Sequence, residues 1–341
     1  MANHPPVVLF GYEASTFTLK ARLALRIKQI PYTFVAVPSM MPRPVLKDTF
    51  NLTYRKIPIL ALGREIYCDT SLIIEALEHF FPESEGYPTL YPKAADGRCY
   101  RGLIRGFASF WTDRPLFRVA CGVMPASIWR SSFGKDRAGL IGHKLDPEKL
   151  EAKIPENMAR WDLHLSMLEP LFQDTNQSPW IYSTKAPSLA DLSLYYELEW
   201  GMDMASGRSQ NALTGGETQD TDTEGATAVF NLQRYPGLYT WFQTFKRYID
   251  ALPSTESTVA EFGEVAEKLK QAPAVGKKSL LLPTPRPALE ELDRKSGLVE
   301  GVVVSVVPDD TGRDEYVVPH PALHSLHSQW SECVGVRIRI C

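Results

Sequence analysis

Cysteine is scarce in this chain and follows no pairing pattern. Five cysteines occur among 341 residues, an odd number at irregular spacing, and no two of them form a CxxC pair. A disulfide-stapled miniprotein is therefore excluded. The first residues carry no basic segment ahead of an apolar stretch, so we expect no secretory signal. Together these absences predict free thiols in a reducing compartment, the cytoplasm.

Charge of one sign and long apolar runs are also missing. Lys plus Arg total 37 and Asp plus Glu total 40, which gives a net charge of −3. A chain this close to neutral has no electrostatic footprint for nucleic acid, so we predict no nucleic-acid partner. No apolar run approaches the ~18 residues that a membrane helix needs, and we predict no membrane contact. Gly-rich phosphate loops and Ser/His/Asp arrays are likewise absent.

What the chain does have is an ordinary globular composition, with 44% hydrophobic residues, and a length that predicts roughly two domains. Residues 5–84 are predicted to form the first domain, a small α/β sandwich. Its strand, helix, strand, hairpin and helix are expected at Val7–Tyr12, Phe17–Lys28, Tyr32–Val37, Ile57–Leu62 with Glu65–Asp69, and Ser71–Phe81. Short joints around the first helix favour a parallel strand pair.

The rest of the chain is predicted to be mostly helical. Residues 95–252 follow helical periodicity, and Ser188-Leu189-Ala190-Asp191 has the form of a capping box that starts an apolar, central helix. Residues 206–226 are rich in Gly, Ser, Thr and acidic residues with almost nothing to bury, which indicates a mobile surface insertion. Residues 273–341 are expected to form a small β-containing extension, with strands at 299–307, 316–318 and 334–340.

Three local patterns bear on function, and a fourth, at Pro187, bears on the fold alone. Ser15-Thr16-Phe17 stands between the first strand and helix, and Ile57-Pro58 opens the third strand. Asp69-Thr70 opens the next helix, and Pro187 precedes the capping box. A helix start offers free N–H groups to an anion, and X–Pro bonds are where cis peptides occur. Each pattern alone also fits a structural reading, as a helix N-cap or a proline at a strand start.

In this order and spacing the patterns resemble the glutathione transferase superfamily over about residues 7–252. The resemblance implies a thioredoxin-like α/β domain followed by an all-α domain, with glutathione as co-substrate and no metal. It implies that the backbone of Ile57, ahead of a cis Pro58, pairs with the cysteinyl part of glutathione. Asp69 and Thr70 would receive the γ-glutamyl end. The family usually has Glu-Ser there, so the aspartate reaches less far.

The resemblance to the Ser-type classes, with a first domain similar to zeta and omega, places Ser15 where the glutathione thiol is activated. A cysteine thiol has a pKa of about 8.5, and a donated O–H bond with the positive end of a helix favours the thiolate. Thr16 stands where these classes have proline. Tyr12 is a rival donor, because Tyr-type classes use a tyrosine near the end of this strand.

Further contacts are implied around these residues. Phe17 belongs to the glutathione-binding pattern, and Arg43 and Lys56 are candidates for the glycyl carboxylate, with solvated loop cations as the alternative reading. The family builds its acceptor pocket beside the helix that carries Phe107 and Trp111, so these are candidate substrate contacts. Histidines at 320, 324 and 327 share one helical face, but Pro319 and Pro321 oppose a helix there and no paired cysteine exists, so no metal site is predicted.

The predicted function is a glutathione-dependent transferase that presents the thiolate to an apolar, electrophilic, unsaturated small molecule. The product is an S-conjugate, or a conjugated olefin isomerised between trans and cis. The chain looks like fungal members found beside biosynthetic genes, and the family predicts a homodimer. The alternative is a non-catalytic regulatory or scaffold module that keeps the fold. A Cys-type thiol reductase is disfavoured because position 15 is serine.

Overall fold

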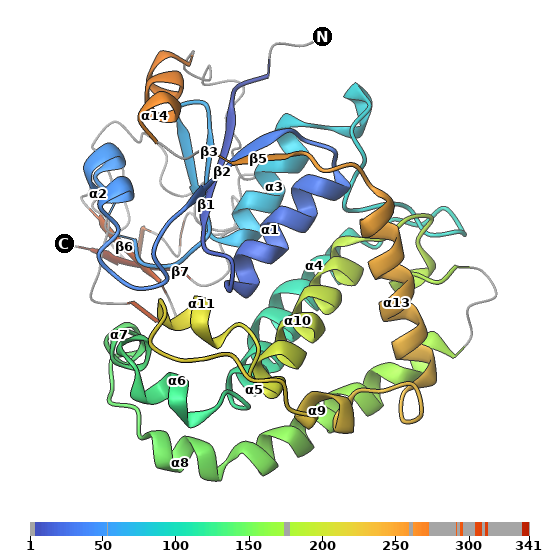
Figure 1. Ribbon diagram of the computed structural model, residues 1–341. Coiled ribbons are helices and arrows are strands. Elements are labelled where there is room, and N and C mark those ends of the chain that lie inside the picture. The colour runs from blue at the N-terminus through green and yellow to red at the C-terminus, as the bar shows by residue number, and fades with distance from the viewer. Residues whose placement is uncertain are drawn as a thin grey trace.

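In the computed structural model, an N-terminal α/β domain lies against a larger helical domain (Figure 1). The structure describes residues 4–52, 54–173, 178–258, 262–272, 291, 294–295, 304–308, 311–312 and 336–340. The two domains meet in the middle of the molecule, where helix α1 (Thr16–Ile27) packs on helix α10 (Leu189–Ser206). The predicted combination of a thioredoxin-like domain and a helical domain is confirmed.

The first domain has the predicted order of elements. They are β1 (Val7–Gly11), α1, β2 (Tyr32–Ala36), β3 (Ile59–Leu62), β4 (Glu65–Cys68) and α3 (Thr70–Phe80). Helix α2 (Pro44–Phe50), between β2 and β3, and the 3₁₀ turn η1 (Glu83–Glu85) are additional elements that the sequence analysis did not predict. β1 and β2 are parallel, whereas β3 is antiparallel to both β1 and β4. Because strand side chains alternate between faces, Leu9 and Leu60 pack toward α1 and α3, while Phe10 and Ile59 face the other side.

The sheet has a fifth strand that the sequence analysis did not predict. After the helical domain the chain returns as β5 (Glu256–Thr258), which pairs in parallel with β2 and gives the order β4-β3-β1-β2-β5. Nε and Nη2 of Arg22 each donate to the Glu256 carboxylate at 2.8 Å, which fastens β5 to α1. Helix α14 (Phe262–Gln271) then covers the sheet face opposite α1 and buries Leu269 there (Figure 1).

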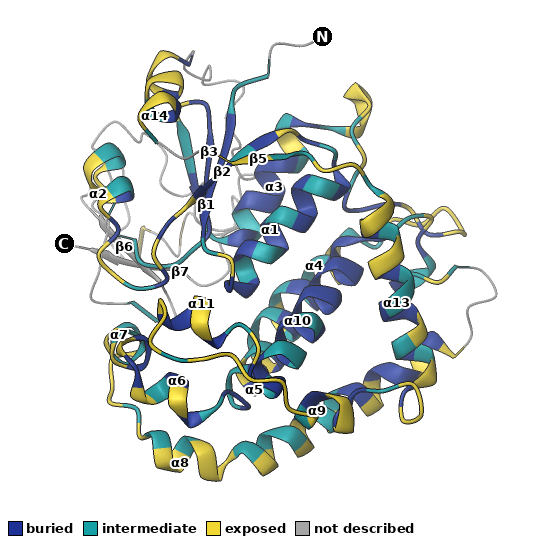
Figure 2. Cartoon of the chain, in the orientation of Figure 1, coloured by how far each residue is buried: buried dark blue, intermediate teal, exposed yellow. Residues whose placement is uncertain are grey.

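The helical domain surrounds α10. Its other elements are α4 (Arg101–Gly106), the π-helix η2 (Phe107–Leu116), α5 (Phe117–Cys121), α6 (Ala126–Arg130), α7 (Ser132–Ile141), α8 (Pro147–Ala152), α9 (Ile154–Leu168), η3 (Glu169–Phe172), η4 (Ile181–Ser183), α11 (Gln210–Thr214), α12 (Gly225–Val229) and α13 (Pro236–Ala251). Figure 2 shows α10 as largely buried and α8 as largely exposed. The domain is therefore organised around one buried central helix, as predicted.

The capping box of α10 is present as predicted. Ser188 Oγ accepts the Ala190 N–H at 3.2 Å, and the Asp191 carboxylate accepts the Ser188 N–H at 2.9 Å. Asp191 also receives the indole N–H of Trp241 at 3.0 Å, which ties α13 to the same point. Burial raises the pKa of Asp191 to about 6 although these bonds oppose the rise.

Two segments differ from the sequence prediction or extend it. Residues 206–226 contain α11, which packs on α6 and α7 and whose Leu213 side chain is only 2% exposed. The expectation that this segment has almost nothing to bury is therefore wrong. In the C-terminal extension, β6 (Val304–Pro308) and β7 (Val336–Ile340) overlap two of the predicted strands, and they pair antiparallel, which the sequence analysis did not predict. The third, at 316–318, lies outside the described residues.

Candidate functional site

The candidate segments meet at one edge of the sheet because of strand register. Phe10 of β1 pairs with Ile59 of β3, and Ile59 pairs with Cys68 of β4. Beyond this row β1 continues into the β1–α1 loop, which holds the serine candidate. Ile57 precedes β3 and Asp69 follows β4 on the same side of the row. The two antiparallel pairings, of β1 with β3 and of β3 with β4, therefore bring the three segments side by side.

Ser15 caps the first helix. Its Oγ accepts the backbone N–H of Thr18 at 3.2 Å, so the hydroxyl proton remains to be donated to another acceptor. The first turn of α1 contains no acidic side chain, so the positive end of the helix is not neutralised by its own residues. The end of β1 approaches helix α1 closely at Gly11, where an added Cβ would lie 2.5 Å from Thr18 Cγ2.

The peptide bond between Ile57 and Pro58 is cis, as predicted. Pro58 is buried and Ile57 is half-buried at the start of β3. A second cis bond, which the sequence analysis did not predict, joins Met41 to Pro42 in the β2–α2 loop. Both prolines therefore lie in segments that border the same edge of the sheet.

Asp69 caps helix α3 from a backbone conformation with φ of 73° and ψ of 129°, which lies outside the left-handed helical region and is rarely occupied by residues other than glycine. Its Oδ1 accepts the Ser71 N–H at 2.8 Å. Burial raises the pKa of the Asp69 carboxyl, and the Ser71 bond and the positive charges of Lys20 and Lys56 oppose that rise. Thr70 follows in the first turn. A carboxylate and a helix N-terminus thus stand together, as a zwitterionic ligand requires.

Arg43 is engaged within the chain. Its side chain is buried, and its Nε donates to the Pro38 carbonyl at 2.8 Å and its Nη2 to the Ser39 carbonyl at 2.9 Å. Nη1 donates to the Arg55 carbonyl. Burial lowers the pKa of Arg43 to about 10. These bonds join the β2–α2 loop to the segment before β3, so the Arg43 guanidinium stabilises the protein's own structure. The other candidate cation, Lys56, is half-buried near Asp69.

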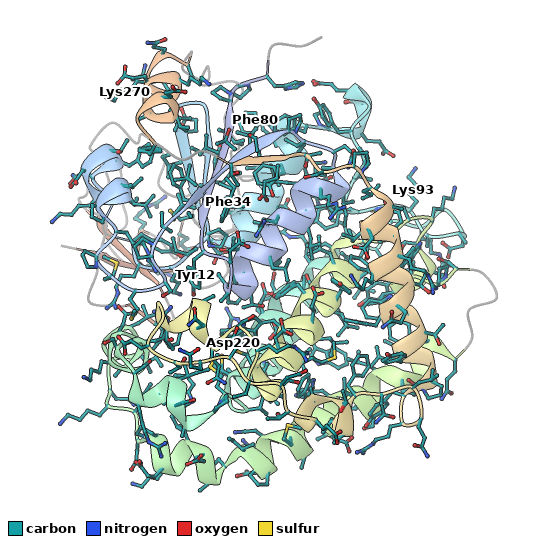
Figure 3. All side chains as sticks on the ribbon, in the orientation of Figure 1. Tyr12, Phe34, Phe80, Lys93, Asp220 and Lys270 are labelled. Carbon is teal, nitrogen blue, oxygen red and sulfur yellow. The ribbon has the colours of Figure 1, made fainter. Side chains whose placement is uncertain are left out.

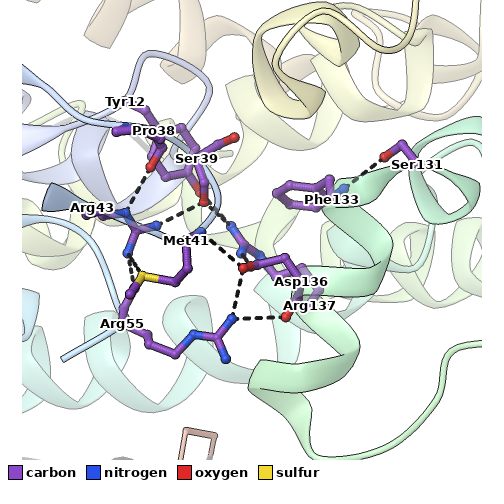
Figure 4. A network of polar contacts seen from close by, with 10 residues as sticks. All are labelled: Tyr12, Pro38, Ser39, Met41, Arg43, Arg55, Ser131, Phe133, Asp136 and Arg137. Atoms are coloured by element: carbon purple, nitrogen blue, oxygen red, sulfur yellow. Dashed lines mark hydrogen bonds and ion pairs between the residues drawn. The ribbon is translucent and has the colours of Figure 1, made fainter. Parts of the chain in front are cut away.

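A polar network reaches this edge from helix α7 of the helical domain (Figure 4). Asp136 Oδ1 accepts from Arg55 Nη2 at 2.9 Å and from the Met41 N–H at 3.1 Å. One carboxylate therefore ties the segment before β3 to the β2–α2 loop across the domain boundary.

Arg137 extends the same network to the end of β1. Its Nη2 donates to the Tyr12 hydroxyl at 3.2 Å and to the Ser39 carbonyl at 3.1 Å (Figure 4). The sequence analysis missed Arg137, because 125 positions separate it from Tyr12 and no local pattern joins them.

A buried ion pair also connects the two domains, between helix α1 and the π-helix η2. Lys20 Nζ of α1 lies 2.6 Å from Asp113 Oδ2 of η2, and the lysine side chain is 1% exposed. Tyr196 of α10 donates its hydroxyl to Asp113. Glu197 is buried beside this group, and burial followed by the charge of Asp113 raises its pKa well above the usual range.

A cluster of aromatic side chains lies at the domain boundary around Phe17. Its ring lies 4.9 Å from that of Phe117 and 6.3 Å from that of Tyr196, measured between centroids. The indole N–H of Trp200 donates to the Ala14 carbonyl at 3.1 Å, which fixes the β1–α1 loop to α10. The boundary therefore offers an apolar surface next to Ser15.

Phe107 and Trp111 lie elsewhere. They line an apolar pocket of about 520 Å³ on the helical domain, and none of its described lining residues comes from the first domain. The other lining residues are Gly102, Leu103, Gly106, Phe110, Pro115, His164, Met167 and Tyr182. Ala108 and Thr112 are buried, whereas Leu103 and Phe110 are exposed beside the pocket. The structure does not bring Phe107 and Trp111 into one pocket with Ser15.

Metal ligands and membrane spans can be assessed over the described part of the chain. There, no group of three or more His, Cys, Asp or Glu side chains is arranged to hold a metal ion. The histidines at 320, 324 and 327 lie outside the described residues. No described helix is both long and apolar enough to cross a bilayer.

The comparisons with known proteins agree with this geometry. Residues 9–85 match the family model for the glutathione S-transferase N-terminal domain, and residues 120–217 match a domain of unknown function. A probable glutathione S-transferase of Solanum tuberosum is 29% identical over 38% of this chain and 51% of its own length. A maleylpyruvate isomerase of Ralstonia sp is 29% identical over 39% of this chain and 58% of its own. The chain thus spans about half the length of the curated relatives it matches.

A solved structure extends the likeness of fold to the whole chain. The GST-like protein of Pseudomonas syringae aligns with a TM-score of 0.55 at 20% identity, over 99% of this chain and 100% of that one. A thioredoxin-like domain with a capped central helix in the domain that follows defines the fold class of the glutathione transferases. Residues 9–85 thus form a domain of the glutathione S-transferase N-terminal family, and the chain as a whole shares the fold of a GST-like protein.

Proposed function

We propose that this chain is a glutathione-dependent enzyme that binds glutathione at the sheet edge bordered by Ser15, Ile57 and Asp69. The strand register that brings these segments together is the observation that carries the proposal. The backbone of Ile57 pairs with the cysteinyl residue. Asp69 receives the γ-glutamyl ammonium, and the N–H groups at Thr70 receive its carboxylate.

In this proposal Ser15 stabilises the glutathione thiolate. A thiol with a pKa of about 8.5 is mostly protonated at neutral pH, and lowering that pKa by two units takes ~2.7 kcal/mol of selective stabilisation. A hydroxyl whose oxygen already accepts the Thr18 N–H keeps its proton for the sulfur. The positive end of α1 contributes to the same stabilisation.

The second substrate is an electrophilic, unsaturated and largely apolar small molecule bound at the domain boundary. The aromatic contacts of Phe17 with Phe117 support an apolar binding surface there. Relatives named glutathione S-transferase support S-conjugation, and the relative named maleylpyruvate isomerase supports isomerisation of a double bond. Both outcomes share the thiolate step. The proposal includes a cytoplasmic homodimer that serves fungal secondary-metabolite biosynthesis.

Two linked measurements test this function. The purified chain is passed over immobilised glutathione and released with free glutathione, and the thiolate absorbance of bound glutathione is then titrated against pH. We expect retention and a thiol pKa below that of free glutathione. Absence of retention would refute the binding site. Retention with an unshifted thiol pKa would favour the non-catalytic scaffold module.

A further inference from the structure

Tyr12 is a second hydroxyl in the loop that carries Ser15. The Ser15 N–H donates to the Tyr12 carbonyl at 3.0 Å, so one tight turn contains both residues. Tyr12 is half-buried and packs against the core at the boundary between the domains (Figure 3). The loop therefore offers two O–H groups on side chains of different length.

Arg137 determines how the Tyr12 hydroxyl can be used. A guanidinium only donates hydrogen bonds, so in the 3.2 Å contact the phenol oxygen is the acceptor. The phenol proton is left to donate elsewhere, and a charged donor on the oxygen makes the O–H a stronger donor.

The guanidinium of Arg137 is itself held in place. It lies 4.2 Å from the centre of the Phe133 ring, donates to Asp136, and its side chain is 17% exposed. Its bond to the Ser39 carbonyl adds a further restraint. The donor is therefore ordered before any substrate binds, as a group that stabilises developing charge must be.

We propose that Tyr12, positioned by Arg137, donates its hydroxyl to the carbonyl oxygen of the second substrate, which is a double bond conjugated to a carbonyl. The inference rests on the proposed function, with Ser15 serving the sulfur. When a thiolate adds to such a system, the negative charge is on the sulfur before the addition and on the carbonyl oxygen after it. A site for this chemistry needs two donors, and this loop supplies two.

The step balances without another reactant. The glutathione thiol loses its proton to solvent, the sulfur bonds to the β-carbon, and the π electrons move to the carbonyl oxygen, which Tyr12 stabilises as an enolate. Protonation of the α-carbon from solvent gives the conjugate. If the C–S bond breaks first, after rotation, the electrons return to the double bond and the olefin is isomerised.

The test compares an acceptor that has a carbonyl with one that has no oxygen. Benzylideneacetone develops an enolate on addition of glutathione, whereas benzyl chloride loses chloride and develops none. We expect Tyr12→Phe to lower kcat/KM for benzylideneacetone by roughly 100-fold, as expected for loss of one oxyanion donor, and to leave benzyl chloride within about twofold. Arg137→Gln should lower the benzylideneacetone rate about tenfold, because the phenol stays but is less ordered and less polarised.

Two further variants separate positioning from scaffolding. The double variant Tyr12→Phe with Arg137→Gln should be no slower with benzylideneacetone than Tyr12→Phe alone, because Arg137 acts through the phenol. Arg55→Gln breaks the neighbouring bond to Asp136 without touching Tyr12. It should leave the ratio of the two rates unchanged, even if both rates or the melting temperature fall.

Equal losses for both acceptors in Tyr12→Phe would overturn the inference, since Tyr12 would then act on the sulfur or on the fold. Additive losses in the double variant would remove Arg137 from this role. A wild type that ionises bound glutathione and uses benzyl chloride but not benzylideneacetone would overturn this inference alone. Failure to bind glutathione at all would instead refute the proposed function.

Discussion

The Lys20 ammonium and the Asp113 carboxylate lie 2.6 Å apart between helix α1 and the π-helix η2, buried at the boundary of the two domains. The pair is additionally bonded by the Tyr196 hydroxyl. Removing one member of a buried pair leaves the other charge uncompensated. The docking of the two domains therefore depends on a contact between residues 93 positions apart.

We expect Lys20→Met to lower the free energy of unfolding by about 3–5 kcal/mol, the usual result of breaking a buried pair. Urea denaturation followed by tryptophan fluorescence measures this. The double variant Lys20→Met with Asp113→Leu removes both charges and should recover a substantial part of the loss. If the double variant is less stable than Lys20→Met by the full effect of a second independent mutation, the two charges are not coupled.

Asp69→Asn should weaken glutathione binding by about 1.5–3 kcal/mol, the range for hydrogen bonds to charged groups, or roughly 10- to 150-fold in Kd. Asparagine keeps the cap, so the fold should persist. Isothermal calorimetry measures the affinity. Asp146→Asn, at the cap of the distant helix α8, is the matched control and should leave the affinity unchanged; equal effects of the two variants would refute the pocket.

Ser15→Ala should raise the pKa of bound glutathione and lower turnover by more than it weakens binding. Loss of a donor to a charged group costs ~2–3 kcal/mol, or about 30- to 150-fold in rate. Loss of the α1 cap also lowers stability by ~1 kcal/mol. Ser15→Thr keeps a hydroxyl and the cap and serves as the control. A thiolate titration of Ser15→Ala that overlays the wild type, with Tyr12→Phe shifted upward, would make Tyr12 the thiolate donor.

Leu269→Ala should lower the free energy of unfolding by about 2–5 kcal/mol, as truncations of buried leucines do. Leu269 of α14 is buried against the sheet face that carries Phe10. The matched control is Leu171→Ala, because Leu171 is 54% exposed and exposed positions change stability by less than about 0.5 kcal/mol. Equal stabilities of the two variants would contradict the packing of α14 on the first domain.

We expect a homodimer in solution, with the exposed apolar side chains around the pocket of α4, η2 and α9 in its interface. Phe110 and Met167 are 57% and 56% exposed there. Phe110→Asp should shift the mass in light scattering from dimer to monomer. Leu232→Asp, at an equally exposed leucine between α12 and α13, should leave the dimer intact. A monomeric wild type would refute the expectation, and a dimeric Phe110→Asp variant would exclude this surface.

Much of the fold was predictable from the sequence because its signals are local. Strand alternation, helical periodicity and the capping box each depend on residues within a few positions, and they located β1, α1 and the start of α10 to within about two residues. The cap at Asp69 was likewise identified from a short pattern, whereas the cis bond before Pro58 was predicted from the resemblance to the glutathione transferases.

Tertiary structure decided what pairs with what. No local pattern connects Glu256 with Arg22, or Arg137 with Tyr12, since more than a hundred residues separate each pair. The same limit applies to Arg43. From its place in a proline-rich loop, the sequence predicted a cation that binds the glycyl carboxylate or is solvated. In the structure it is buried and its N–H groups donate to backbone carbonyls.

The sequence by itself determined most helices and strands of this protein, because these form from contacts between near neighbours, whereas β5 forms only by pairing with the distant β2. Only the tertiary structure decided which side of η2 faces α10, and hence that Phe107 and Trp111 line an outward pocket. It also decided that α7 reaches the end of β1. Both depend on the packing of whole elements, where burial of the largest complementary surfaces outweighs any local preference.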